Sequence, residues 1–225
     1  MIGTLANVVA VIIGGGLGLL FRRRLPARLT DSLIKAMGLC VFVIGISGAI
    51  KGDIMLLVVS LGLGTLIGEI LDIDKALNRL GAWLQKKLGS GESKLAEGFV
   101  TTTLLFCVGA MAIVGSIESG LTGDHTIIFT KSVIDAVSSI VFASALGAGV
   151  LLSAIPVLLY QGSIVLFAGA LQGVFSEALI SQISATGCVM ILAIGLNMIT
   201  GAKIKVANLL PALLVAVAYY YLILV

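Results

Sequence analysis

Long apolar runs separated by short polar turns make up most of the chain. Most of these runs are close to the roughly 20 residues that a helix needs to cross the hydrocarbon core of a bilayer. The pattern therefore predicts an all-α fold, that of a polytopic membrane protein with about eight transmembrane helices. The expected spans cover residues 2–21, 30–50, 54–71, 97–117, 131–152, 157–171, 186–200 and 207–225.

Composition agrees with this pattern. Of the 225 residues, 59% are hydrophobic and 11% are charged, which is far more apolar than a soluble domain of this size. The first apolar run precedes its cluster of arginines, whereas the charged region of a signal peptide comes first, so we expect a retained first span. The sequence predicts one integral membrane domain over residues 1–225.

The positive charges predict an orientation. With eight spans, twelve of the fourteen Lys and Arg residues fall on one side of the membrane, and only Lys51 and Lys131 fall on the other. Cytoplasmic loops carry the excess of Lys and Arg, so both termini are expected outside.

The longest polar stretch covers residues 72–96. Apolar side chains fall on one face of a helix drawn through it, and basic side chains fall largely elsewhere. This arrangement indicates an amphipathic helix on the cytoplasmic membrane surface. A docking helix for a soluble partner is the alternative.

Two segments of the chain are similar to each other. VFVIGIS at residues 41–47 resembles ILAIGLN at residues 191–197, and each precedes a short turn and a final apolar span. Residues 1–71 and 153–225 would then be two repeat halves around a central helix pair at residues 97–152. A hairpin or a broken helix is expected at residues 153–156. Chance similarity between apolar helices is the alternative interpretation.

The linkers indicate how such repeats would be oriented. The turn after the first span is rich in arginine, whereas its counterpart, a linker or a short helix at residues 172–185, has no Lys or Arg and contains Glu177. If the two repeats cross the membrane in opposite directions, only the first of these linkers is cytoplasmic, and the loss of positive charge from the second agrees with this. Inverted repeats are found in many secondary transporters, with binding sites near the membrane midplane.

Asp135 is the most informative polar residue. It lies about one turn inside the polar end of the span at residues 131–152, on a helical face shared with Lys131, Ser138 and Ser139. Charges at membrane depth are costly and usually face a bundle interior or a water-filled cavity. We interpret Asp135 as a cation or proton site. An i, i+4 ion pair with Lys131 near the membrane surface is the alternative.

Other polar side chains inside the expected spans offer amide and hydroxyl ligands. For Asn197 an interhelical hydrogen bond is the alternative role. The candidate residues for binding a substrate or an ion are Asp135, Asn7, Asn197, Gln161, Ser138, Ser139 and Thr102.

Several kinds of site are not expected. The three cysteines have no metal-type spacing, and His125 with Asp124 provides fewer ligands than a metal site needs, so we predict neither a metal nor a cofactor. No basic patch with interleaved aromatic residues indicates nucleic acid. No Gly-x-Ser-x-Gly or His-Glu-x-x-His motif is present, so we do not expect an enzyme.

The segment LFCVGAMAIVGSI at residues 105–117, with Gly123-Asp124 and Lys131-Ser132 after it, resembles the YdfK/YqgA-type family of bacterial inner-membrane proteins, a domain of unknown function. The N-terminal Ile2-Gly3-Thr4 and the stretch at residues 153–162 are similar as well. The resemblance covers nearly the whole chain and implies a multi-pass protein of the bacterial inner membrane.

The pattern favours a secondary transporter of a small solute or ion, with Asp135 as the coupling site. The alternatives are an ion channel, or a non-transporting scaffold or sensor that acts through residues 72–96. The expected partners are the lipid bilayer, the small solute or ion, and a second copy of the chain in a homodimer.

Overall fold

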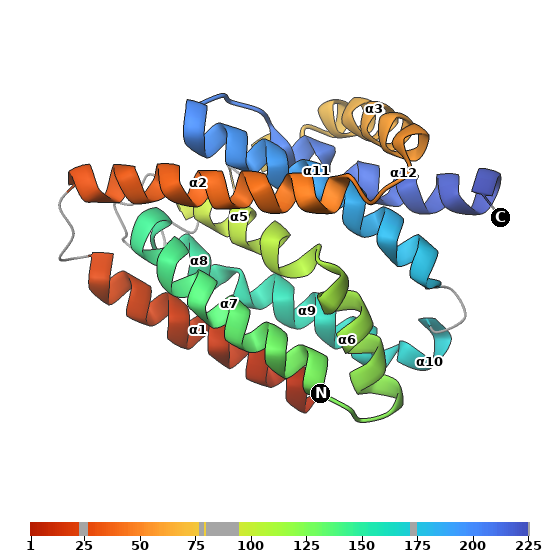
Figure 1. The fold of residues 1–225 in the computed structure, drawn as a ribbon, viewed down its shortest axis with the longest axis horizontal. Helices are drawn as coiled ribbons and strands as arrows, with labels where there is room; N and C mark the ends of the chain where they lie inside the picture. Colours follow the sequence, from red (N-terminus) through yellow and green to blue (C-terminus); the bar gives the residue numbers. More distant parts are fainter. Residues whose placement is uncertain (23–26, 77–78, 80–94, 172–174, 225) are drawn as a thin grey trace. The chain divides into compact units, whose positions relative to one another are not determined.

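Helices form every element of the described residues, which are 1–22, 27–76, 79, 95–171 and 175–224 of a computed structural model (Figure 1). The predicted all-α class is confirmed. The elements are α1 (Ile2–Arg22), α2 (Ala27–Ala49), α3 (Ile54–Leu71), α5 (Leu95–Cys107), α6 (Ala110–Leu121), α7 (Thr126–Leu146), α8 (Gly149–Leu152), α9 (Ala154–Leu166), α10 (Ala168–Leu171), α11 (Glu177–Thr200), the 3-10 helix η1 (Val206–Leu209), α12 (Pro211–Tyr219) and the π-helix η2 (Tyr220–Leu224).

Six segments of the described chain are long and apolar enough to cross a membrane. The helices α5 and α6 are bent by 56° at the break between them, and they make a seventh candidate if the pair is one span. The apolar part of α2, Ile34–Ala49, is shorter than the other candidates. A membrane protein is therefore supported, whereas the predicted number of eight spans is not confirmed. The six are Ile2–Arg22, Ile54–Leu71, Thr126–Leu146, Gly149–Leu166, Glu177–Thr200 and Val206–Ile223.

The central hairpin turns at a different residue from the one predicted. Helix α7 ends at Leu146, and Gly147 has a φ of 89°, a conformation that glycine adopts without steric cost. Of the two structures expected at residues 153–156, the hairpin is therefore wrong and the broken helix is present, since Ser153 has helical angles and separates α8 from α9. Helix α7 also begins at Thr126, five residues before the predicted start at Lys131, and this earlier start places Asp135 near the middle of α7 instead of one turn from its end.

The linker before α11 is shorter than predicted. Helix α11 begins at Glu177 and continues for 24 residues, so most of the expected linker at residues 172–185 is helical. Its remaining residues include 172–174, which lie outside the described part of the chain. Most of the predicted amphipathic helix at residues 72–96 also lies outside it, because residues 77–78 and 80–94 are not described.

The chain divides into two compact units, each assembled from two separate segments. Unit 1 comprises Met1–Lys35 and Gly91–Ser176, and unit 2 comprises Ala36–Ser90 and Glu177–Val225. Unit 1 therefore contains α1 and α5 to α10. Unit 2 contains α3, α11, α12 and most of α2.

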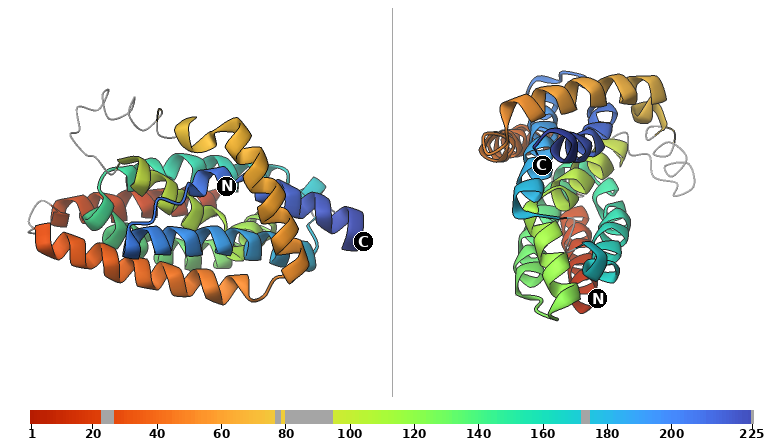
Figure 2. Two further views of the ribbon diagram at one scale, coloured as in Figure 1. Left: turned by 90° about the horizontal axis from the view of Figure 1, so that it is seen from above. Right: turned by 90° about the vertical axis from the view of Figure 1, so that its right-hand side faces the viewer.

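In unit 1, α1 and α7 lie side by side and run in the same direction (Figures 1 and 2). The glycines of α1 make this close approach. Gly3 lies against Ile128, Gly14 against the backbone of Ala136, and Gly18 against the backbone of Ile140. Small residues allow such contacts between membrane helices. Helix α9 packs on α1 in the opposite direction, with Gly162 near Met1 and Leu151 of the preceding turn near Gly15.

In unit 2, two pairs of antiparallel helices make similar contacts. Gly45 of α2 lies against the backbone of Leu192 of α11, and Gly195 of α11 lies against the backbone of Phe42. In the second pair, Gly64 of α3 packs on Ala212 of α12. Glycine therefore lines the helix contacts of this unit as well.

Candidate functional site

An ion pair is buried at the middle of α7. Lys131 Nζ contacts Asp135 Oδ2 one helical turn away, and the two residues are only 5% and 4% exposed. Asp135 lies nine residues after the start of α7, about 13 Å along a helix of about 30 Å. The predicted ion pair is thus present, but it lies deep in unit 1 and not at the end of a span.

Two amide side chains extend this pair across three helices. Asn7 of α1 donates from Nδ2 to Asp135 Oδ2 at 3.0 Å and to Gln161 Oε1 at 3.2 Å. Both amides are fully buried. We call Asn7, Lys131, Asp135 and Gln161 the buried polar cluster. It joins α7, α1 and α9, so it forms only when these three helices pack together.

An aromatic ring and a helix break border the cluster. Lys131 Nζ lies 5.6 Å from the ring centre of Phe106, which is a favourable position for a cation. Phe106 is in the last turn of α5, directly before the break that separates α5 from α6. Discontinuous helices of this kind are common at the binding sites of transporters.

Several polar atoms in and near the cluster have no hydrogen-bond partner among the described residues. In the cluster these atoms are Asn7 Oδ1 and Gln161 Nε2, and both are buried. Thr4 Oγ1, one turn from Asn7 on α1, and Ser139 Oγ, one turn from Asp135 on α7, are also buried without a hydrogen-bond partner among the described residues. Most buried polar groups in proteins are paired, so these atoms indicate unused capacity for a ligand.

Of the seven candidate residues, Asp135, Asn7 and Gln161 come together. Ser139 is buried one turn along the same face of α7, and Ser138 is half-buried. Thr102 is buried on α5, where its hydroxyl donates to the carbonyl oxygen of Gly98 at 2.7 Å.

Asn197 belongs to unit 2 and has a different contact. Its side chain donates to the carbonyl oxygen of Ile204 at 2.8 Å and accepts from the amide of Ile204 at 3.0 Å. Both bonds are made to the backbone of the turn that follows α11. This geometry ties down the turn within unit 2.

Three residues in the cluster or bordering it were not among the candidates: Lys131, Phe106, whose ring lies beside Lys131, and Thr4, one turn from Asn7 on α1. The i, i+4 spacing of Lys131 and Asp135 predicted their ion pair. Lys131 was not a candidate because it was expected near the membrane surface. Thr4 shares a helical face with Asn7, which its spacing of three residues indicates. Phe106 had no signal, because the approach of α5 to α7 is a tertiary contact.

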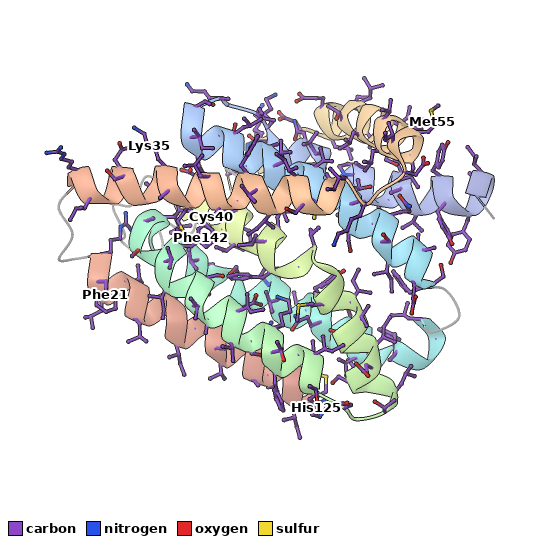
Figure 3. All side chains as sticks on the ribbon, in the orientation of Figure 1. Phe21, Lys35, Cys40, Met55, His125 and Phe142 are labelled. Atoms are coloured by element: carbon purple, nitrogen blue, oxygen red, sulfur yellow. The ribbon has the colours of Figure 1, made fainter. Side chains whose placement is uncertain are left out.

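The polar residues before α7 have structural partners. His125 lies at the start of α7 (Figure 3), and its Nδ1 is 2.8 Å from Ser119 Oγ. Asp124 Oδ1 accepts hydrogen bonds from the Thr126 hydroxyl and from the Thr126 amide, and these bonds lower the pKa of Asp124. Across the described chain, no three His, Cys, Asp or Glu side chains gather as a metal would need.

Apolar helices of spanning length, packed around buried charged and amide groups, define a polytopic helical membrane protein. The chain belongs to the family described as "Protein of unknown function (DUF554)", whose model matches residues 2–221. This finding confirms the resemblance to the YdfK/YqgA-type family.

Two relatives have closely similar lengths. The chain is 36% identical over 221 residues to the uncharacterized membrane protein YdfK of Bacillus subtilis (strain 168), covering 96% of this chain and 93% of YdfK. It is 33% identical over 222 residues to the uncharacterized protein YqgA of Escherichia coli (strain K12), covering 96% and 94%. No solved structure matches the chain.

Proposed function

We propose that this protein is a secondary transporter of a small solute or ion, with Asp135 as the residue that binds a cation or a proton. The buried polar cluster is the observation that carries this proposal. It combines a charged pair with unpartnered amide atoms inside a bundle of apolar helices.

Burial of this pair needs a functional reason. Removing two charges from water costs several kcal/mol per ion, and packed apolar side chains of similar volume often serve stability as well or better. Ionisable groups within membrane segments commonly mark ion pathways and proton relays. A role in transport explains why a carboxylate and an ammonium group lie at the middle of α7.

The packing directions support an inverted repeat. In the repeat hypothesis α1 corresponds to α9, α2 to α11 and α3 to α12, and each of these pairs packs antiparallel within its own unit. Gly45 and Gly195 occupy the same position of the repeated segment, and each contacts the second residue of the other copy. The cluster contains one amide from α1 and one from α9, as a site at a repeat interface requires.

The proposed setting is the bacterial inner membrane, with both termini outside, as the distribution of Lys and Arg favours. The partners are then the lipid bilayer, a small solute or ion, and a second copy of the chain. We assign no catalytic step to the cluster.

Reconstituted protein tests the proposal. Liposomes with pyranine inside would report proton movement when gradients of alkali cations, organic acids or amino acids are applied. We expect at least one gradient to move protons with the wild-type protein, and Asp135→Asn to abolish that signal while the protein still inserts. An equal signal from Asp135→Asn, or none from any gradient with the wild type, would contradict the proposed function.

A further inference from the structure

The charges of the buried polar cluster balance each other. The ammonium group of Lys131 and the amide of Asn7 both donate to Asp135 Oδ2, and the two amide side chains of the cluster are neutral. A solute with a net charge would leave this buried site with an excess charge, which is costly in an interior of low dielectric constant. The electrostatics of the cluster therefore favour a solute whose own net charge is zero.

The two amides of the cluster offer one acceptor and one donor in a single place. Asn7 Nδ2 donates to Gln161 Oε1 at 3.2 Å, so the two amide groups are in direct contact. The other atom of each amide, Asn7 Oδ1 and Gln161 Nε2, has no hydrogen-bond partner across the described part of the chain. Both side chains are fully buried. A solute with both a donor and an acceptor can satisfy these two atoms, which buried polar groups normally require.

Apolar side chains border the amides on one side. Val11 follows Asn7 by one turn of α1, and Val157 precedes Gln161 by one turn of α9. Both valines are buried with Phe106 in one hydrophobic cluster. This border offers no partner to a further charge, so it favours a solute whose remaining part is uncharged.

We propose that the buried polar cluster binds a small zwitterion, namely an α-amino acid with an uncharged side chain. This inference rests on the proposed transport function and specifies its substrate class. Asp135 and Asn7 Oδ1 accept hydrogen bonds from the ammonium group of the solute, which is the cation that Asp135 binds. Lys131 and Gln161 Nε2 donate to its carboxylate. The solute separates Lys131 from Asp135, but each charge keeps an opposite charge beside it, and the cluster stays neutral.

Equilibrium binding to the full-length protein in detergent micelles tests this proposal. The probes are tritiated glycine, alanine, serine, valine and leucine, and we expect saturable binding of at least one of them. Two analogues of that amino acid then compete with it: the matched amine, which lacks the carboxylate, and the matched carboxylate, which lacks the ammonium group. Each should bind at least about tenfold more weakly, because it leaves one charged group of the cluster without its hydrogen-bond partner.

Two variants should reverse this preference. Lys131→Met leaves the cluster with a net negative charge, so it should bind the matched amine more tightly than the amino acid. Asp135→Leu leaves a net positive charge and should prefer the matched carboxylate. A pair that only stabilises the fold would not change which analogue binds best. Retained preference for the amino acid in either variant would contradict the proposal.

The free donor of the cluster is tested on α9 with a matched control. Gln161→Met removes Nε2 at similar side-chain length and should weaken binding of the amino acid at least about tenfold, since a bond to its carboxylate is lost. Ser163 is exposed on the same helix and donates to the carbonyl oxygen of Tyr160. Ser163→Ala should leave the affinity unchanged.

Three further results would overturn the inference. They are no saturable binding of any of the five amino acids, equal wild-type affinity for the amino acid and one of its two analogues, and unchanged affinity in Gln161→Met. The first two need no variant, so they remain decisive if a variant fails to fold.

The inference and the proposed function fail separately. Proton movement in the liposome assay that depends on Asp135, without amino-acid binding, would support transport of another solute and overturn the zwitterion site. Amino-acid binding with the predicted analogue preference, but without movement of any solute in liposomes, would support the site and contradict the transport function.

Discussion

At the residue scale, the energetics of unit 1 depend on the pair of Lys131 and Asp135. Each charge is buried, and each is stabilised mainly by the other and by the donors around it. Loss of one partner leaves an uncompensated charge, whereas replacing both with apolar side chains of similar volume leaves no buried charge at this position. The two kinds of variant should therefore differ in stability.

Lys131→Met alone should lower the free energy of unfolding by about 3–5 kcal/mol, because it leaves Asp135 unpaired. The double variant Lys131→Met/Asp135→Leu should recover most of this loss. Thermal unfolding in detergent micelles, followed by circular dichroism, measures the difference. Strictly additive effects of the two substitutions would show that the charges do not interact.

The sequence indicated most members of the buried polar cluster, but it did not indicate how far along α7 the cluster lies. Asp135, Asn7 and Gln161 are polar residues inside apolar runs, and this is a signal that one sequence contains. The depth of Asp135 depended on where α7 begins and ends. Gly147 ends that helix through its backbone conformation, and several other glycines were equally good candidates for the turn.

At the element scale, glycines determine how closely the helices approach. In the run of glycines on α1, Gly14 lies against the backbone of Ala136, whereas Gly16 has no atom within 4 Å of the place that a Cβ would take. These two positions have the same local sequence context but different tertiary contacts. They provide a matched pair for testing the packing of α1 on α7.

Gly14→Ala should destabilise the protein by about 1–3 kcal/mol, because the added methyl group would collide with the carbonyl oxygen of Ala136. Gly16→Ala should be neutral or stabilising by up to about 1 kcal/mol, since alanine favours helix formation. Thermal midpoints of the two purified variants, compared with the wild type, measure the contrast. Equal midpoints for the two variants would exclude a close contact at Gly14.

A second prediction at this scale concerns the start of α7. Asp124 accepts hydrogen bonds from Thr126, which lower the pKa of Asp124 in the folded protein. Its stabilising effect is therefore fully present above the pKa of the unfolded chain and is lost as pH falls through the folded value. Asp124→Ala should lower the thermal midpoint at pH 7. The difference from the wild type should shrink steadily below about pH 4, the ordinary range of this group. A difference that stays constant down to pH 2 would contradict this account.

At the scale of the whole molecule, the direction of the helices constrains the topology. Helices α1 and α7 are parallel, so an odd number of crossings must lie between them if both cross the membrane. Three crossings, by α2, by α3 and by the bent pair of α5 and α6, satisfy this condition. One crossing, by α3 alone, satisfies it too, whereas two crossings do not. If α3 crosses, α2 and the bent pair therefore either both cross the membrane or both do not, and the eight-span topology is the one in which both cross.

Single cysteines in a background without the three native cysteines test this topology. Residues 51, 122 and 202 are exposed and lie in turns of the described structure. With a thiol reagent that does not cross membranes, Lys51→Cys and Thr122→Cys should be labelled in intact cells. Ala202→Cys should be labelled only after permeabilisation. Labelling of all three in intact cells, or of Ala202→Cys alone, would require a different number of crossings.

The sequence predicted the class of the fold and most of its spans, since length and apolar character alone indicate them. It could not predict the division into two units, in which the first segment of the chain packs with residues 91–176 and the last segment packs with residues 36–90. The partners of Gly45 and Gly195 depend on long-range packing, and any small residue in an apolar helix is compatible with such a contact. The bend between α5 and α6 likewise had no clear signal in the sequence.

The most direct test of the central claim is access to the cluster from the two sides of the membrane. Ser139→Cys, in the cysteine-free background, places a thiol one turn from Asp135, and a small charged thiol reagent can be applied to right-side-out and to inside-out vesicles. A transporter that exposes its site to each side in turn predicts labelling in both kinds of vesicle. It also predicts that a bound substrate slows labelling from at least one side. No labelling from either side, with Lys51→Cys labelled in parallel, would show that the cluster is a closed structural core and would contradict the account.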